Sequence, residues 1–146
     1  MSEIRIEEVT VADDELVEAM QALLPQLSTS AKPIEAYDME SIVASPATIL
    51  YVARAEDGIV GTLTLVVFRS LTGARCWIED VVVDGRARGR GVGELLVGAA
   101  LDGARRANAR SVDLTSNPTR VGANRLYQRC GFVQRETNVY RFSLAS

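Results

Sequence analysis

Short stretches rich in apolar and β-branched residues, several of them alternating with polar residues, are separated along the chain by turn-forming segments. Such stretches predict β-strands with one buried face. The predicted strands are IRIEEV (4–9), TILYVARA (48–55), IVGTLTLVVF (59–68), CWIEDVVVD (76–84), SVDLTS (111–116), FVQR (132–135) and VYRFSL (139–144). A turn at 56–58 joins the second and third strands into a hairpin, and SLTGAR (70–75) turns the chain again. The last two strands are expected to close the sheet as an antiparallel pair.

Four other segments space their apolar residues at the helical intervals of three and four. They cover about 13–27, 34–43, 92–107 and 123–130, and the last one stops at Gly131, a residue type that commonly caps helices. The longest apolar face is that of the third helix: Val92, Leu95, Leu96, Ala99, Ala100, Gly103, Ala104 and Ala107. The order β-α-α-β-β-β-α-β-α-β-β predicts a mixed α/β domain of the α+β kind, with a largely antiparallel central sheet flanked by helices.

Composition places the chain among ordinary globular proteins. Its 146 residues, 47% of them hydrophobic and 24% charged, are expected to form a single domain spanning 1–146. A net charge of −3 predicts no general affinity for nucleic acid, and no apolar run approaches the roughly 18 residues of a membrane span. The N-terminal stretch lacks the apolar core of a signal peptide, and Cys76 and Cys130 give no pattern of a disulfide framework. A cytoplasmic location is therefore expected.

The chain contains no histidine, and this narrows the chemistry open to it. Catalytic groups that pair serine or cysteine with histidine are excluded. Zinc sites built on imidazole are excluded as well, and two cysteines cannot complete a structural zinc site, so no metal is expected. Any acid–base step must use Asp, Glu, Tyr, Lys, Cys, water or backbone groups.

The stretch RARGRGVGELL (86–96) joins the strand 76–84 to the start of the third helix. A helix start attracts anions through its unpaired N–H groups and its dipole, glycine lets those groups approach phosphate oxygens, and arginine adds charged donors. We interpret the stretch as a phosphate-binding loop; the alternative is an exposed turn, where glycine and arginine are also common. The P-loop pattern is absent, and Glu94 and Leu96 occupy the positions where a dinucleotide fingerprint needs its third glycine.

A different pattern fits this loop: Arg88-x-x-Gly91-x-Gly93 after the strand EDVVV. With this pattern in VVVDGRARGRGVGELL, and with ANRLYQRCGF further on, the chain resembles the GNAT superfamily of N-acetyltransferases from about Trp77 to Phe132. Two motifs in order are more specific than either alone. The resemblance implies the GNAT acyl-CoA N-acyltransferase fold, with acetyl-CoA as cosubstrate and a site where two neighbouring strands splay apart.

The resemblance also implies roles for particular residues. Val81 and Val83 would give backbone contacts to the acetyl-pantetheine arm, Asn124 would lie near the pantetheine, and Tyr127 near the sulfur. The pyrophosphate would be bound by backbone amides, namely those of Arg88, Gly89, Arg90, Gly91 and Gly93. From the residues alone, Asn124 is equally well an exposed helix residue, and Tyr127 is equally well a core residue on an apolar helix face.

Acetyl transfer from a thioester to an amine requires a neutral amine facing the carbonyl, a donor for the developing oxyanion and a proton for the leaving thiolate. A backbone N–H in the strand 81–83 is the candidate donor to the oxyanion. Tyr127 is the candidate that gives a proton to the leaving thiolate. Glu79 and Asp80 are candidate general bases; strand residues alternate faces, so only one should reach the cleft unless a bulge intervenes. The alternative is that these carboxylates are merely exposed. Cys130 is interpreted as core filler, which favours direct transfer over a cysteine relay.

The acceptor is expected to be an amine of a small molecule or a peptide. Acidic residues of IEAYDME (34–40) offer a cationic amine a partner, but they equally fit a solvated helix face. WIEDVVV (77–83) also resembles the matching strand of glucosamine-6-phosphate N-acetyltransferases, so an amino-sugar phosphate is the alternative acceptor.

Two other classes of function stay open. One is a non-catalytic, regulatory acyl-CoA-binding module, against which Tyr127 argues. The other is a nucleic-acid-binding module using the arginines of 86–90, against which the net charge and the lack of interleaved aromatic residues argue. Our preferred reading has no nucleic-acid or membrane partner. It leaves a homodimer open.

Overall fold

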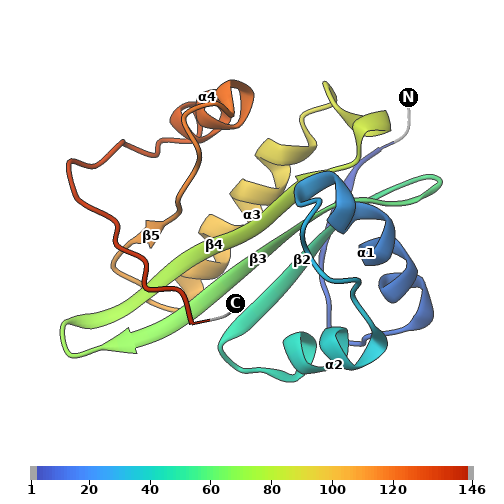
Figure 1. Cartoon of the computed structure of the whole chain (residues 1–146), viewed down its shortest axis with the longest axis horizontal. Coiled ribbons are helices and arrows are strands. Elements are labelled where there is room, and N and C mark those ends of the chain that lie inside the picture. Colours follow the sequence, from blue (N-terminus) through green and yellow to red (C-terminus); the bar gives the residue numbers. More distant parts are fainter. Residues whose placement is uncertain (1–2, 145–146) are drawn as a thin grey trace.

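A five-stranded sheet forms the centre of the computed structural model, which describes residues 3–144 (Figure 1). The strands lie side by side in chain order: β1 (Arg5–Glu8), β2 (Thr48–Ala55), β3 (Gly58–Ser70), β4 (Gly73–Val83) and β5 (Val112–Asp113). β1 to β4 pair antiparallel, and β5 runs parallel to β4. Two tight turns fold β2, β3 and β4 back on one another, and each is followed by a glycine with positive φ, 123° at Gly58 and 126° at Gly73.

Four α-helices flank the sheet: α1 (Asp14–Leu27), α2 (Ala36–Ala44), α3 (Val92–Arg106) and α4 (Val121–Arg129). α1 begins at Asp13, whose carboxylate accepts the N–H of Leu16 at 2.9 Å, the usual way to satisfy a helix start. α1 and α2 bury their apolar stripes on one face of the sheet, and α3 buries its stripe on the opposite face. The mixed α/β architecture predicted from the residue pattern is confirmed.

α3 packs closely on the sheet because both sides of the contact carry a glycine. A Cβ atom on Gly61 of β3 would lie 3.1 Å from Val92 and 3.2 Å from Leu96. A Cβ atom on Gly103 of α3 would collide with the hydroxyl of Tyr51. The start of α3, which carries the glycine–arginine loop, is therefore held at a fixed position against β3 and β4.

β4 and β5 run together for only a short distance. Their paired residues are Cys76 with Val112 and Trp77 with Asp113. Beyond these two pairs the described chains separate, β4 continuing to Val83 along β3 while the chain after β5 turns towards α4. The divergence exposes the edge of β4 beyond these pairs, and the resemblance to GNAT proteins places a ligand where two neighbouring strands separate.

A β-bulge interrupts β4 beside this divergence. Thr64 pairs with Glu79 and Thr62 pairs with Val82, so two residues of β4 lie opposite the single residue Leu63. Asp80, one of the two, has φ of 52°, which is a left-handed conformation that residues with a side chain seldom adopt. The bulge reverses the alternation of faces, because Ile78 packs on the α3 side whereas Val82 packs on the α1 side.

The predicted closing pair of strands at 132–135 and 139–144 is wrong. Residues 132–144 form no strand in the described structure, and several of their apolar side chains are exposed: Val133, Val139, Tyr140, Phe142 and Leu144. The predicted strand 111–116 is likewise paired only at Val112–Asp113. Alternation gives each stretch an apolar side, but a two-stranded ribbon is stable only when that side is covered, and the two-residue β5 offers little edge on which to build.

Candidate active site

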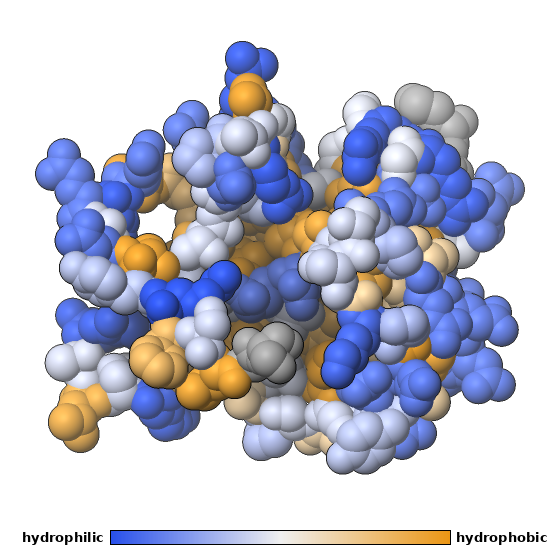
Figure 2. Space-filling view, in the orientation of Figure 1, coloured by the Kyte–Doolittle hydropathy of each residue, from blue (hydrophilic) through white to orange (hydrophobic). Residues whose placement is uncertain are grey.

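A cleft of about 220 Å³ opens where β4 and β5 diverge. One wall includes Glu79, Asp80 and Val81 of β4, and the other consists of residues after β5. Tyr127 of α4 and the end of α1 also line the cleft. Figure 2 shows this face of the molecule hollowed between the α4 side and the α1 side, with hydrophobic residues deep in the hollow. The structure therefore brings together Tyr127, Val81 and both of the candidate bases, Glu79 and Asp80.

The bulge explains why both acidic residues reach the cleft. In a regular strand Glu79 and Asp80 would point to opposite faces, whereas here both are exposed and both line the cleft. Glu79 is held in place by the indole of Trp77, which donates a hydrogen bond to its Oε1 at 2.7 Å. The hydrogen bond uses only part of the acceptor capacity of this carboxylate, which also lines the cleft.

Tyr127 is buried, as a core residue is, and it also lines the cleft, so a packing role does not exclude a role near the sulfur. Its side chain is 7% exposed, and its ring meets that of Phe132 edge to face with centroids 6.0 Å apart. Burial raises the pKa of the Tyr127 phenol, against a smaller lowering by the charge of Arg120. The phenol is therefore protonated at neutral pH and can act as a proton donor.

Asn124 has a partner of its own within the protein. Its Nδ2 donates to the carbonyl oxygen of Asn117 at 3.0 Å, and the side chain of Asn117 in turn accepts the N–H of Thr119 at 2.9 Å. These bonds shape the turn that leads into α4 and carries Arg120 to the cleft. In this structure Asn124 holds that turn.

The glycine–arginine loop has the geometry of an anion site. Gly89 and Gly91 adopt positive φ of 81° and 75°, and Gly91 is the N-terminal cap of α3. A Cβ atom on either glycine would meet no protein atom within 4 Å, so the space above the loop is open. Gly93 differs from these two glycines, because a Cβ atom added there would lie 2.8 Å from the Leu126 side chain. The lack of a side chain at Gly93 lets α3 and α4 pack against each other.

The three arginines of the loop are not equivalent. Arg86 is bound within the protein, to Asp84 at 3.0 Å and to Asp57 at 3.2 Å. All three arginines are exposed, and Arg88 and Arg90 flank the positive-φ Gly89. Because Arg86 is neutralised locally, the loop presents a smaller positive surface than its sequence indicates, which weighs against a nucleic-acid-binding patch.

Comparison with known protein families agrees with this fold and with the two motifs. Residues 15–132 match the Acetyltransferase (GNAT) family. The chain belongs to the GNAT family. A putative acetyltransferase from Agrobacterium tumefaciens has a similar structure at 25% identity, with a TM-score of 0.84 over 95% of this chain and 99% of that one. The fold is shared with glucosamine-6-phosphate N-acetyltransferase from Arabidopsis thaliana at 21% identity, with a TM-score of 0.81 over 96% of this chain and 98% of that one.

Aminoglycoside N-acetyltransferase AAC(6')-Iy in complex with CoA also shares the fold, at 18% identity, with a TM-score of 0.82 over 99% of this chain and 97% of that one. In sequence, 62 residues are 39% identical to glucosamine 6-phosphate N-acetyltransferase 1 of Oryza sativa subsp. japonica. That stretch covers 42% of this chain and 36% of the rice protein, so the match spans about a third of the relative.

The residues that line the cleft differ in part from those predicted from the sequence. Val83, the last residue of β4, pairs with Gly61 and is not among the residues that line the cleft. Arg120 and Ser28, which line it, were not predicted, because each lies in an irregular segment with no recognisable spacing. Among residues 3–144, no group of His, Cys, Asp or Glu side chains is arranged to hold a metal ion, and no helix is long and apolar enough to cross a membrane.

Proposed function

We propose that the protein transfers the acetyl group of acetyl-CoA directly to a primary amine of a small molecule or peptide. The observation that carries this proposal is that three features occur together: the open, positive-φ glycine loop between β4 and α3, the exposed edge of β4, and the buried Tyr127 phenol, which lines a cleft with β4 residues. A molecule with a pyrophosphate at one end, amides along its arm and a thioester at the other needs those features in that order.

The residues present fit acetyl-CoA. Backbone amides of Arg88, Gly89, Arg90, Gly91 and Gly93 would hold the pyrophosphate, since they lie at or next to the helix start. The edge of β4 at Val81 would pair with the amides of the pantetheine arm as an added strand does. Ser116, on the opposite wall's segment, has a buried hydroxyl with no hydrogen-bond partner among residues 3–144, and an amide of the arm would supply one.

When bound, acetyl-CoA supplies the activated acyl group, and the remaining tasks fall to the chain. A β4 backbone N–H beside the bulge would stabilise negative charge on the carbonyl oxygen. Tyr127 would donate its proton to the departing sulfur, and Glu79 would accept a proton from the amine. Burial raises the pKa of the Cys130 thiol, which disfavours the thiolate and agrees with direct transfer.

A regulatory module that binds acyl-CoA without turnover is the alternative from another class. The position of Tyr127 in the cleft, beside two carboxylates, favours an enzyme. The rice relative's activity on glucosamine 6-phosphate makes an amino-sugar phosphate the first acceptor to test. We further propose that the protein acts in the cytoplasm.

Release of free CoA in the presence of candidate amines tests the proposal directly. The panel should contain glucosamine, glucosamine 6-phosphate, an aminoglycoside, polyamines, amino acids and short peptides, each at equal concentration with acetyl-CoA. We expect CoA release with at least one amine and an acetylated product of matching mass. If acetyl-CoA stabilises the protein but no amine causes release of CoA, the regulatory alternative is favoured. If acetyl-CoA neither stabilises the protein nor releases CoA, the enzyme and the regulatory module are both refuted.

Replacement of Glu79 by glutamine tests the general base. Gln keeps an oxygen that can accept the Trp77 hydrogen bond, so the strand geometry should survive while the basic carboxylate is lost. We expect kcat at neutral pH to fall roughly a hundredfold, judged from typical general-base contributions, and to recover partly as pH rises through the pKa of the amine.

Asp80→Asn is the matched control, because Asp80 lies next in the chain on the same cleft wall. A pH profile of Glu79→Gln that parallels the parent profile would show that Glu79 only binds or positions the acceptor. If Asp80→Asn instead shows the pH-dependent loss, the base is Asp80.

A further inference from the structure

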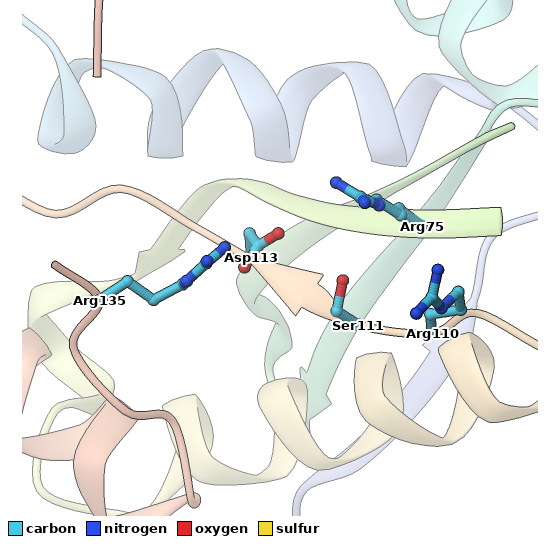
Figure 3. Close-up of a pocket in the computed structure, with 5 residues that line it drawn as sticks. All are labelled: Arg75, Arg110, Ser111, Asp113 and Arg135. Atoms are coloured by element: carbon cyan, nitrogen blue, oxygen red, sulfur yellow. The ribbon is translucent and has the colours of Figure 1, made fainter. Parts of the chain in front are cut away.

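A second pocket lies on the same side of the sheet, about 160 Å³ in volume, and its chemistry differs from that of the cleft. It is lined by Arg75 of β4, Arg110 and Ser111 ahead of β5, Asp113 of β5, and Arg135 of the C-terminal segment. Figure 3 shows the side chains of Arg75 and Arg135 reaching towards Asp113 from opposite sides, with Ser111 and Arg110 beside them. Three guanidinium groups around one carboxylate leave a local charge of +2.

We propose that this pocket binds a phosphate group carried by the acceptor amine, so that the substrates of this protein are phosphorylated amines. The link to an amine rests on the acetyl transfer proposed above. The charge argument points to phosphate in particular: a phosphate monoester carries about −1.5 to −2 charges at neutral pH, which matches the surplus in the pocket better than a single carboxylate does.

Two of the arginines are already held in position by the β3–β4 turn. Arg75 donates from Nη2 to Thr72 Oγ1 at 3.2 Å, and Arg110 donates from Nη1 to the Thr72 carbonyl oxygen at 2.6 Å. Each of these bonds uses one of the five N–H donors of its guanidinium. The anchored groups can therefore engage an anion with their other donors, and less side-chain entropy is lost on binding than for a mobile arginine.

The pocket is also in line with the proposed reaction centre. Arg75, Trp77 and Glu79 are alternate residues of a regular part of β4, so they point to the same face of the sheet. At about 3.3 Å per residue, the Cα atoms of Arg75 and Glu79 are separated by roughly 13 Å. Trp77 lies between them and is bonded to Glu79. In this proposal, an acceptor molecule lying over Trp77 places its amine near Glu79 and its phosphate near Arg75.

β5 forms the other side of the surface that runs along β4 from Arg75 past Trp77 to Glu79, and the register between the two strands fixes which of its residues face this surface. Trp77 pairs with Asp113, so Ser111 and Asp113 share the face of Arg75 and Trp77. This surface therefore crosses the two residue pairs that join β4 to β5. The proposed catalytic cleft lies at one end of it and the arginine pocket at the other. Arg135 reaches the pocket from the exposed C-terminal segment.

The pocket is tested first by binding, without reliance on activity. Inorganic phosphate and acetate are titrated into the whole protein by calorimetry at low salt, and again into Arg75→Gln and Arg135→Gln. Arg69→Gln is the matched control, since Arg69 is an exposed arginine near the same turn that does not line the pocket. We expect phosphate to bind at least tenfold more tightly than acetate, and each pocket variant to lose about ten- to a hundredfold.

Asp113→Asn provides a change in the opposite direction. Removing its negative charge should strengthen phosphate binding severalfold, because a like charge no longer faces the anion. Arg135→Gln keeps the test valid if Arg75→Gln unfolds, because Arg135 lies on an exposed irregular segment. Equal loss in Arg69→Gln, or equal affinity for acetate and phosphate, would overturn the proposal.

Kinetics then connects the pocket to the acceptor. With glucosamine 6-phosphate and glucosamine as a matched pair, we expect the phosphorylated amine to have the higher kcat/KM, and Arg135→Gln to raise its KM while leaving glucosamine unchanged. If phosphate binds but no amine is acetylated, the proposed transfer fails and the anion site stands. If amines are acetylated with no preference for the phosphorylated one, the acceptor proposal fails and the transfer stands.

Discussion

Turnover should fall between roughly tenfold and a thousandfold when Tyr127 is replaced by phenylalanine, while the protein keeps its stability and its affinity for acetyl-CoA. The substitution removes only the hydroxyl, and the phenyl ring can retain its edge-to-face contact with Phe132 and its place in the core beneath α3. The departing sulfur would then lack a proton donor. The loss should appear in kcat, measured with an acceptor slow enough for chemistry to limit the rate.

The pH dependence of the parent protein sharpens this prediction. Burial raises the pKa of the Tyr127 phenol above its ordinary value of about 10, so the donor stays protonated throughout the neutral range. The same shift favours the folded state below that ordinary value, and this contribution is lost as pH rises through the raised pKa. Activity of the parent should therefore show no decline from Tyr127 between about pH 7 and 9. An unchanged kcat in Tyr127→Phe would leave Tyr127 with a packing role alone.

Acetyl-CoA should raise the melting temperature of the parent protein and should do so far less for a variant at Gly91. At a hundredfold excess over its dissociation constant, a ligand specific to the native state adds about 2.7 kcal/mol of stability, or roughly 5–11 °C for a domain near 150 residues. Gly91→Asn is the informative change. Asn tolerates the positive φ of 75°, but its side chain would occupy the open space above the loop.

Two further variants separate loss of binding from loss of folding. Gly91→Val fills the same space but also strains the backbone, so its unliganded melting temperature should fall as well. Gly98→Ala on α3 is the control: its Cβ meets no atom within 4 Å, and alanine favours helix, so the ligand-induced rise should be kept in full. A full rise in Gly91→Asn would exclude the glycine loop as the pyrophosphate site.

The parts of the fold that local sequence controls were predictable. The strand 48–55 coincides with β2, and the helix of about 13–27 corresponds to α1, because apolar spacing and turn residues act within a few positions. The glycine loop could be recognised for the same reason. The C-terminal pair failed because alternation says which side of a strand is apolar but not whether another part of the chain covers it.

Features that depend on contacts between distant parts of the chain could not be predicted from the sequence. The bulge that turns Glu79 and Asp80 to the cleft depends on the register between β3 and β4. From the residues alone we expected only one of the two carboxylates in the cleft, with a bulge as the exception. The arginine pocket joins side chains at 75, 110 and 135, which no spacing rule connects. The role of Gly93 likewise required the position of Leu126, thirty-three places further along the chain.

The short contact between β4 and β5 also affects how stability is distributed in the molecule. Two residue pairs join the C-terminal part of the described chain to the sheet, supplemented by the packing of α4 and the ion pair of Arg129 with Glu94 at 2.9 Å. Such a junction is where a domain opens locally at a cost well below that of global unfolding. A ligand that bonds to both strand edges would restore the missing rungs and couple the two parts into one cooperative unit. Occupancy of the cleft would then be felt in backbone amides on both sides of the junction, as slower exchange with solvent.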